Sequence, residues 1–454
     1  MNPEFERNLW LEASPRRLFG LAVVLGLIYA ATRLVSGGDN HGLLVALFTV
    51  GLCVFAACGG IWAARAAGSS VLDEIRGRTW EFQRLSALTP WAMTWGKLLG
   101  AGSLAWFGAA TGIVAVGLTT AVLDGPADAL AVVAGMIGLV LFLQGCAMGA
   151  ALVGVRKARA EGRVATGGAV LLGVVGGLVL LNALANHLPI HGQSWTGGGL
   201  NLLSRGPVTF WGQVLPGAAF ASVSLCLFAG WAVVGAWRLM RLELQMRNSP
   251  WIWVAFLLFA GLWRAGLAAS ETGILGQVLT AGAVFAALAY ASAFVEPADP
   301  VRLRRFVAAL SRGELMAAAG LAPLVVFALK LALLCGLVAV VTPRPALGDM
   351  PFPTTVVATL VFMIRDIGVI ALFRYGPRPG RGDLSAVIAL ALLYGVGAIL
   401  DKVVFAGLGA ALFSPLTTFA PLSVLISGVV QAAAVWVVVG QRVFSSDAAA
   451  PQAV

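Results

Sequence analysis

Residues 71–100 read VLDEIRGRTWEFQRLSALTPWAMTWGKLLG and form the longest charge-dense passage in an otherwise apolar chain. Within this passage, residues that suit a buried helical face recur at steps of three and four positions. They are Leu72, Ile75, Thr79, Phe82 and Leu85. Because charged side chains occupy the positions between them, the spacing predicts an amphipathic helix over 71–90 that lies along a surface.

The composition around this passage is that of a protein that crosses a membrane many times. Of the 454 residues, 59% are hydrophobic and 11% are charged, whereas soluble domains carry about 25% charged residues. The 56 glycines suit helices in lipid, where small residues let backbones approach closely. All five cysteines lie inside apolar runs, so they predict neither a disulfide framework nor a metal site.

Twelve apolar runs approach the roughly 20 residues that a helix needs to cross a bilayer core. The first run follows Arg16 and Arg17 without a clear cleavage site, so we expect it to be a retained span. The runs cover 18–35, 42–64, 98–122, 129–155, 165–186, 212–237, 251–268, 273–294, 319–342, 354–373, 384–406 and 419–440.

The positions of Lys and Arg predict the orientation of these spans. If the runs alternate in direction, 23 of the 30 basic residues fall on the side that carries both termini, and five fall on the other side. The remaining two, Lys330 and Arg365, lie within spans. Because basic loops stay in the cytoplasm, we expect both termini to be cytoplasmic. The net charge of +10 is thereby explained by short loops and indicates no nucleic-acid partner.

The runs divide into two sets of six, and in each set the longest cytoplasmic segment follows the second span. This arrangement indicates a parallel duplication, although the second segment, 295–318, lacks the Thr, Pro and Lys landmarks of the first. We expect an all-α polytopic membrane protein. Its predicted parts are an interfacial helix over 1–17, a first six-span unit over 18–237, a cytoplasmic connector over 238–250, a second six-span unit over 251–440 and a flexible tail over 441–454.

Residues 71–100 resemble the permease subunits of type-2 ABC exporters. Those proteins have six-span units with a cytoplasmic helix between the second and third spans, and the likeness extends to the topology of the whole chain. The matching positions are Asp73 or Glu74, Arg76-Gly77, Arg78-Thr79-Trp80-Glu81, Leu85-Ser86, Leu88-Thr89-Pro90 and Gly96-Lys97-Leu98-Leu99.

The resemblance implies a transmembrane subunit in the bacterial cytoplasmic membrane that is driven by a separate P-loop ATPase. No segment matches Gly-x-x-x-x-Gly-Lys-Ser/Thr, so ATP and Mg are expected on the partner and this chain is not expected to be an enzyme. The cargo implied by mostly apolar spans is hydrophobic or amphipathic. Since family permeases pair, either the two units replace that pair or a second permease chain joins them.

The resemblance assigns the coupling role to residues 71–90 and to the start of the third span. Charged contacts with the ATPase are expected from Glu74, Arg76, Arg78 and Glu81. The helix is expected to bend at Gly77 and to end at Pro90, and the Lys97 side chain is expected to snorkel to the membrane face. Thr79, Trp80 and Leu85 complete the expected coupling set. The alternative is an ordinary amphipathic connector that covers the base of the bundle.

Three ionisable residues lie at membrane depth, where charges are costly unless they are paired or hydrated. They are Lys330, Arg365 and Asp366. Counted from the cytoplasmic ends of their predicted spans, Lys330 and Asp366 differ in depth by only about 5 Å. We therefore predict an ion pair between them that clamps the second bundle. The alternative is a path for a substrate or a proton.

Two other residue sets have simple explanations. His41, His187 and His191 fall on the predicted outer side, and Pro189 argues against a regular helix that presents the last two to a metal. Asp383 together with Asp366 superficially resembles the two aspartates of intramembrane proteases, but a solvated helix cap explains Asp383 more simply.

Two other function classes stay open. The first is a secondary transporter of the major facilitator kind, driven by an ion gradient and also built from twelve spans. Its loop motif has Gly, Asp and Gly-Arg at fixed intervals. Here the corresponding residues are Gly68, Asp73 and Gly77-Arg78, and each interval is one residue longer. The second is an intramembrane protease that uses Asp366 and Asp383.

Overall fold

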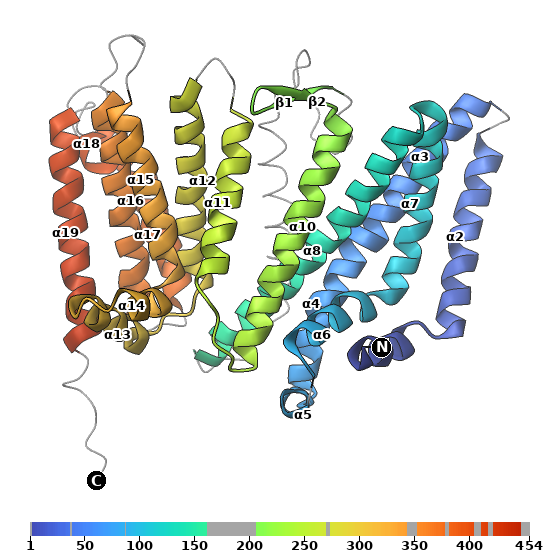
Figure 1. The fold of residues 1–454 in the computed structure, drawn as a ribbon, viewed down its shortest axis with the longest axis horizontal. Helices are drawn as coiled ribbons and strands as arrows, with labels where there is room; N and C mark the ends of the chain where they lie inside the picture. The colour runs from blue at the N-terminus through green and yellow to red at the C-terminus, as the bar shows by residue number, and fades with distance from the viewer. Residues whose placement is uncertain are drawn as a thin grey trace. The chain divides into compact units, whose positions relative to one another are not determined.

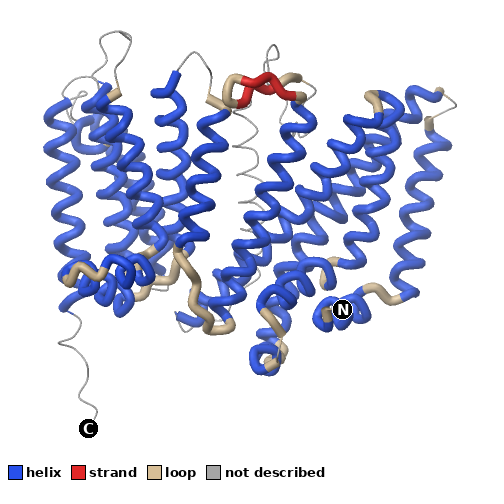
Figure 2. Tube along the Cα trace, viewed as in Figure 1, coloured by secondary structure: helices blue, strands red, loops and turns tan. Residues whose placement is uncertain are grey.

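The computed structural model describes residues 2–36, 39–86, 88–160, 206–268, 273–342, 352–376, 381–403, 410–415 and 421–445. Nearly all of these residues are helical, as Figure 2 shows. Within these ranges the sheet structure is limited to one antiparallel two-stranded hairpin. The chain forms two compact units, Met1–Asn248 and Ser249–Val454, called unit 1 and unit 2 below.

Unit 1 contains long helices together with short helices that gather at the end where the N-terminus lies (Figure 1). The long helices are α2 (Pro15–Val35), the continuous run of α3 (Asn40–Phe55), η1 (Ala56–Trp62) and α4 (Ala63–Arg76), then α7 (Ser103–Leu123), α8 (Pro126–Ala160) and α10 (Gly217–Glu243). The short ones are α1 (Pro3–Glu12), α5 (Trp80–Leu85), α6 (Pro90–Trp95) and η2 (Gly96–Gly100). At the other end, β1 (Val208–Phe210) pairs with β2 (Gln213–Leu215).

Small residues allow the long helices of unit 1 to pack backbone to backbone. A Cβ added at Gly112 of α7 would lie 2.6 Å from the carbonyl oxygen of Gly51 in α3, so neither helix could carry a side chain there without moving. Lipid offers no hydrophobic gain when helices associate, and close van der Waals contact takes its place. The abundance of glycine in the sequence therefore has its structural reason in such contacts.

Unit 2 is also helical, and its core lies between α12, α15 and α16. Its elements are α11 (Trp251–Gly266), α12 (Gly273–Val295), α13 (Pro300–Ser311), α14 (Leu315–Leu321), α15 (Leu324–Val341), α16 (Phe352–Arg374), α17 (Gly382–Val403), α18 (Ala410–Phe413) and α19 (Pro421–Ser445). The buried residues of that core are Leu257, Phe285, Ala289, Ala328, Ala332, Met363 and Ile367.

The prediction of an all-α polytopic membrane protein is confirmed. Among the described residues, nine helices are long and apolar enough to cross a membrane, and α11 and α17 are shorter apolar helices. The predicted run 165–186 lies outside the described residues. The count of twelve spans and their division into two six-span halves therefore stay predictions.

Several predicted boundaries were wrong. The run 212–237 begins only at Gly217 of α10, because residues 208–215 form the hairpin, and α10 continues through Glu243 into the predicted connector. The span predicted over 319–342 begins at Leu324, directly after Pro323. Helix α19 continues to Ser445, so the predicted tail over 441–454 starts as helix. Hydropathy marks where a helix leaves the bilayer core, whereas hydrogen bonds decide where the helix ends.

Candidate functional site

Residues 71–100 contain the end of the long helix α4 and the short helices α5, α6 and η2, instead of the single helix predicted over 71–90. Helix α4 ends at Arg76, α5 covers Trp80–Leu85, and α6 begins at Pro90. Pro90 therefore starts a helix instead of ending one, because the first helical position needs no backbone N–H donor. The hydroxyl of Thr89 caps α6 by accepting a hydrogen bond from the Ala92 N–H.

The bend after α4 is made by two consecutive residues. Gly77 closes the helix, since its N–H donates to the Asp73 carbonyl at 2.8 Å. Arg78 then adopts the left-handed conformation with φ 55°, which non-glycine residues seldom do. The bend predicted at Gly77 is therefore one residue away from the left-handed position. Arg78 turns the chain so that α5 folds back toward α4.

Glu74 is the point at which four elements of unit 1 meet. Its carboxylate, near the end of α4, forms ion pairs with Arg7 of α1 and Lys97 of η2. It also accepts a hydrogen bond of 2.7 Å from the Gln83 side-chain amide of α5. Charge-assisted hydrogen bonds are the stronger ones in proteins. Glu74 therefore ties α5 to the base of the long helices through its side chain.

Lys97 lies inside this cluster and does not snorkel to a membrane face as the sequence suggested. Its side chain is 0% exposed and donates to Glu4 at 2.9 Å as well as to Glu74. The ammonium group also lies 5.7 Å from the centre of the Trp80 ring, within the range of a cation–π contact. Glu4 and Glu74 supply two negative charges and Arg7 and Lys97 two positive ones, so the cluster is neutral. A buried ammonium group of this kind requires such partners.

Helix α1 completes the cluster because it docks on a surface without side chains. A Cβ at Gly96 would lie 2.6 Å from the Cβ of Glu4, and a Cβ at Gly100 would lie 2.8 Å from that of Asn8. The Asn8 amide donates to the Glu4 carbonyl and to the Gly96 carbonyl, at 2.9 and 3.4 Å. The predicted interfacial helix over 1–17 is thus a ten-residue helix with one face packed on protein.

Glu4, Arg7 and Asn8 belong to the site although they were not predicted from the sequence. Two signals pointed to them. Glu4 and Asn8 stand four residues apart and so share one helical face. Gly96 and Gly100 repeat the same spacing at the start of the third predicted span, which is the pattern of a close helix contact.

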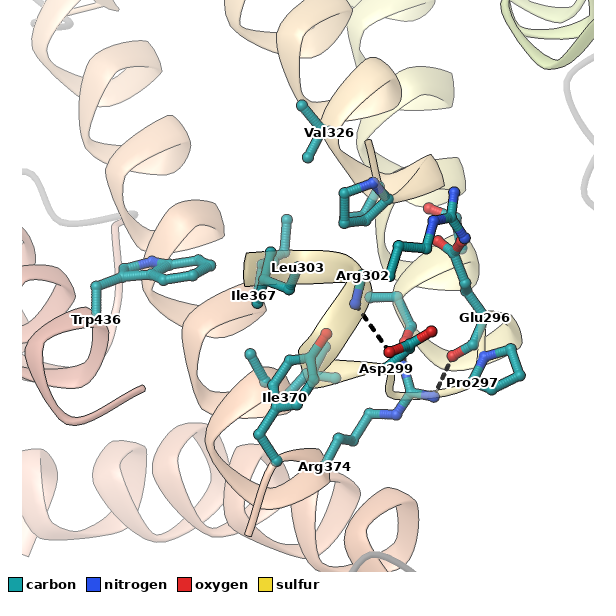
Figure 3. Close-up of a pocket in the computed structure, with 16 residues that line it drawn as sticks. Glu296, Pro297, Asp299, Arg302, Leu303, Val326, Ile367, Ile370, Arg374 and Trp436 are labelled. Atoms are coloured by element: carbon teal, nitrogen blue, oxygen red, sulfur yellow. Dashed lines mark hydrogen bonds and ion pairs between the residues drawn. The ribbon is translucent and has the colours of Figure 1, made fainter. Parts of the chain in front are cut away.

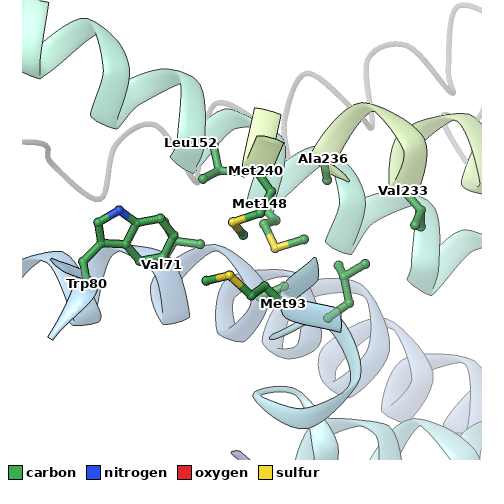
Figure 4. Close-up of a cluster of buried hydrophobic side chains, with 10 residues drawn as sticks. Val71, Trp80, Met93, Met148, Leu152, Val233, Ala236 and Met240 are labelled. Carbon is green, nitrogen blue, oxygen red and sulfur yellow. The ribbon is translucent and has the colours of Figure 1, made fainter. Parts of the chain in front are cut away.

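A hydrophobic cluster beneath these charges fixes the segment to α8 and α10 (Figure 4). Trp80, the first residue of α5, is 2% exposed and belongs to this cluster. The other members include Val71, Met93, Met148, Leu152, Val233, Ala236 and Met240. Three of the coupling residues named from the sequence, Glu74, Trp80 and Lys97, are therefore brought together by the fold.

Most of the other residues of the predicted coupling set are exposed, whereas Pro90 is half-buried. Phe82 and Leu85 of α5 are 78% and 86% exposed, although the predicted periodicity assigned both to the buried face. That assignment was wrong because the bend at Arg78 resets the helical phase, so that Trp80 and Gln83 point inward instead. Arg76, Arg78, Thr79 and Glu81 are also exposed, and Arg76 lies 3.7 Å from Asp73. The result is a mixed apolar and charged surface on α5 and the preceding turn.

The corresponding segment of unit 2, residues 295–318, is fastened differently (Figure 3). Arg302 of α13 forms an ion pair with Glu296 and donates to the carbonyls of Leu321 and Ala322, both at 3.0 Å. Arg374 donates to the Ala293 and Glu296 carbonyls. Ala293, Glu296, Arg302 and Arg374 line a pocket of about 110 Å³. Tyr375 lies in the wall of this pocket. Burial raises the pKa of its hydroxyl, and the positive charge of Arg374 partly offsets that rise.

The membrane-depth charges of unit 2 form a closed network without Lys330. The Arg365 guanidinium donates to Asp366 Oδ1 at 2.7 and 2.9 Å, and both side chains are buried. The Tyr290 and Tyr394 hydroxyls donate to Asp366 Oδ2 at 2.8 and 2.7 Å. Four helices, α12, α16, α17 and α19, are joined there, since Arg365 also donates to Gln431 of α19 at 3.0 Å.

The predicted ion pair between Lys330 and Asp366 was therefore wrong. Lys330 is exposed, and it lies only six residues after Leu324, where α15 begins. At 1.5 Å per residue it is about 9 Å from that end, a distance within reach of a snorkelling lysine. The predicted span start at 319 placed the residue too deep, because residues 315–321 belong to the separate helix α14.

The two aspartates considered as a protease pair bind different arginines. Asp383 lies 3.0 Å from Arg374 at the end of α16, whereas Asp366 binds its neighbour Arg365 in the same helix. His41 is exposed at the start of α3, and His187 and His191 lie outside the described residues. In the part of the chain that the structure describes, no three His, Cys, Asp or Glu side chains gather as metal ligands would.

No protein-family model, curated protein or solved structure matches this chain. The resemblance to type-2 ABC permeases thus rests on residues 71–100 and on the predicted topology.

Proposed function

We propose that this chain is the transmembrane permease subunit of an ATP-driven exporter of the type-2 ABC class, and that α5 is the docking point of its separate ATPase. One observation carries the proposal. Helix α5 lies at the far tip of the short helices (Figure 1) and exposes Phe82 and Leu85, while its other face is fixed to the spans through Trp80 and Gln83. Exposed apolar side chains with charged neighbours are typical of a surface that binds another protein.

The contacts of Glu74 provide a route for mechanical coupling. A partner that pushes on α5 moves Gln83 and Trp80, which contact Glu74 and Lys97 respectively. Lys97 belongs to η2, which leads directly into the long helix α7, and Glu74 belongs to α4, which continues the helix that starts at Asn40. Movement of α5 is thereby passed to two long helices at once.

The proposed orientation follows from the basic residues. Since the predicted loops on the side of the N-terminus hold 23 of 30 Lys and Arg, this end of unit 1 belongs in the cytoplasm, where an ATPase is available. ATP and Mg are bound by that partner. The cargo is proposed to be hydrophobic or amphipathic, and the membrane to be the bacterial cytoplasmic membrane.

The test is copurification of the full-length chain from its native membrane. Wild-type protein is expected to bring down a P-loop ATPase, and the double variant Phe82→Asp, Leu85→Asp is expected to lose it. Met246→Asp is the matched control, because Met246 is an exposed apolar residue just after α10 in the same unit. The proposal fails if the wild-type chain binds no such ATPase, or if the double variant retains it as well as the control does.

The buried carboxylate of Asp366 favours a second candidate, a secondary transporter driven by an ion gradient. Carboxylates at membrane depth commonly belong to ion paths, although here Arg365 already neutralises the charge. Transport assays in vesicles separate the two candidates. Uptake driven by a proton gradient without nucleotide, and abolished by Asp366→Asn, would establish the secondary transporter and exclude the exporter.

A further inference from the structure

A pocket of about 540 Å³ lies between α1 and α4 in unit 1. One wall is a stripe of α1 that includes Arg7, Leu11 and Glu12, and the facing wall is a stripe of α4 with the adjoining end of η1. The residues of that second stripe recur at helical spacing, so they share one face. They are Trp62, Arg65, Ala66, Ser69, Ser70, Asp73 and Glu74.

Each carboxylate of this pocket already has a cation. Glu12 lies 3.4 Å from Arg17, Asp73 lies 3.7 Å from Arg76, and Glu74 binds Lys97 and Arg7. Arg65 is different, because it makes no ion pair or hydrogen bond with any of the described residues. The pocket thus carries one unmatched positive charge, and that charge belongs to Arg65.

Arg65 is exposed and directly follows the predicted span 42–64, at the cytoplasmic end of that span. It lies 11 residues before the end of α4, about 16 Å along a helix that is continuous with a predicted membrane span. Beside the pocket, α1 ends at Glu12 and the span α2 begins at Pro15, so the pocket lies where the chain enters the membrane. An exposed guanidinium group at this boundary lies where the anionic groups of membrane lipids are found.

The side chains around Arg65 suit an amphiphilic ligand. Ser69, one turn further along α4, and Ser70 bring hydroxyl groups to the same wall, and these now donate only to carbonyls of their own helix. Trp62 and Leu11 line the pocket as well and are 39% and 64% exposed. Cationic and hydroxyl groups bordered by exposed apolar groups match a phosphate attached to acyl chains.

We propose that this pocket binds the phosphate of a membrane phospholipid from the leaflet at the α1 end of unit 1, with Arg65 as its counter-ion. Arg65 and the two serines hold the phosphate oxygens, and Trp62 and Leu11 contact the first part of the acyl chains. A guanidinium group suits this role because it donates several hydrogen bonds to one phosphate. This assignment does not depend on the proposed transport function.

Native mass spectrometry of the full-length protein, titrated with phosphatidylglycerol in detergent, tests the assignment. The wild-type protein is expected to retain one lipid more tightly than Arg65→Gln does, by about tenfold in Kd for the loss of one charged hydrogen-bonding group. Arg33→Gln is the matched control. Arg33 is an exposed arginine in the last turn of α2, a helix that begins beside the pocket at Pro15. Its substitution is expected to leave lipid retention unchanged.

Two further measurements keep the proposal falsifiable. Ser69→Leu adds an apolar side chain to the pocket wall without removing a charge and is also expected to weaken retention. The melting temperature of lipid-free Arg65→Gln should equal that of the wild type, because Arg65 has no internal partner to lose. Equal retention by Arg65→Gln and wild type would overturn the proposal. Displacement of the lipid by millimolar inorganic phosphate would assign the pocket to a free phosphate instead and would equally overturn it.

Discussion

Lys97 shows how a single residue connects the chemistry of unit 1 with its architecture. As part of a Gly-Lys pair at the start of a span it resembles an interfacial lysine, yet its ammonium group is enclosed by Glu4 and Glu74. A buried ion pair adds little net stability, but removing one member leaves an uncompensated charge. Substitution of Lys97 should therefore weaken the contacts among α1, α4 and α5.

Lys97→Met should lower the free energy of unfolding by about 3 kcal/mol, because Glu4 and Glu74 then share Arg7 as their remaining cation. Adding Glu4→Gln should restore part of the loss, since it removes the one negative charge that Arg7 does not neutralise. The measurement is reversible unfolding in mixed micelles, with the single variants and the double variant analysed as a cycle.

Lys330→Met is the control for this prediction. Lys330 is exposed and has no ion pair among the described residues, so its substitution should change stability by less than about 0.5 kcal/mol. If Lys97→Met were as stable as Lys330→Met, Lys97 would not be what holds the two carboxylates.

At the scale of elements, the segment 71–100 demonstrates why periodicity alone misplaced a helix. Leu72 and Phe82 fit one helical face in sequence, but the chain leaves the helix at Gly77, and the left-handed Arg78 rotates everything that follows. Two signals favoured a break, namely Gly77 itself and the Thr89-Pro90 pair, which is a helix start. The apolar periodicity outweighed both in the prediction.

The docking of α1 depends on the absence of side chains on η2. Gly96→Leu should detach α1, because a Cβ at this position already meets the Glu4 side chain at 2.6 Å and the Phe5 backbone nitrogen at 2.9 Å. A detached α1 unfolds locally and becomes a substrate for proteases. Limited trypsin digestion should then cut after Arg7 at least about tenfold faster than in the wild type, an increase that corresponds to about 1.4 kcal/mol in the opening equilibrium.

Gly20→Leu provides the matched comparison for this digestion. A Cβ at Gly20 in α2 meets no atom within 4 Å, so the same substitution there should leave cleavage after Arg7 unchanged. Faster cleavage in both variants would mean that bulk in the membrane region, and not contact with α1, opens the N-terminal helix.

At the scale of the whole molecule, the sequence was sufficient for the class of fold and for most spans. Long apolar runs have one stable solution in a bilayer, the helix, because backbone groups must be satisfied internally. The candidate site was predictable only in part. Glu74, Trp80 and Lys97 were named, but their partner Glu4 comes from a segment 93 residues away from Lys97. No local pattern encodes such a contact.

The two units differ in how their short helices are attached. In unit 1, α5 is joined to the long helices through side chains, by the Gln83 to Glu74 bond and by Trp80. In unit 2, Arg302 joins α13 to backbone carbonyls at the end of α14, and both helices lie across the ends of the spans of that unit (Figure 1). Leu315 and Met316 of α14 are exposed there, where an interfacial helix would meet lipid.

This difference predicts that the proposed ATPase contacts unit 1 preferentially. A photoreactive amino acid at Phe82 should cross-link to the ATPase, whereas the same probe at Met316, which is 76% exposed against 78% for Phe82, should cross-link mainly to lipid. The comparison is matched because both positions are exposed apolar residues on short helices outside the long ones. Cross-linked products from intact membranes, identified by mass spectrometry, give the yields. Equal yields of ATPase adduct at the two positions would show that the partner binds both units alike, and that side-chain anchoring of α5 does not define the docking site.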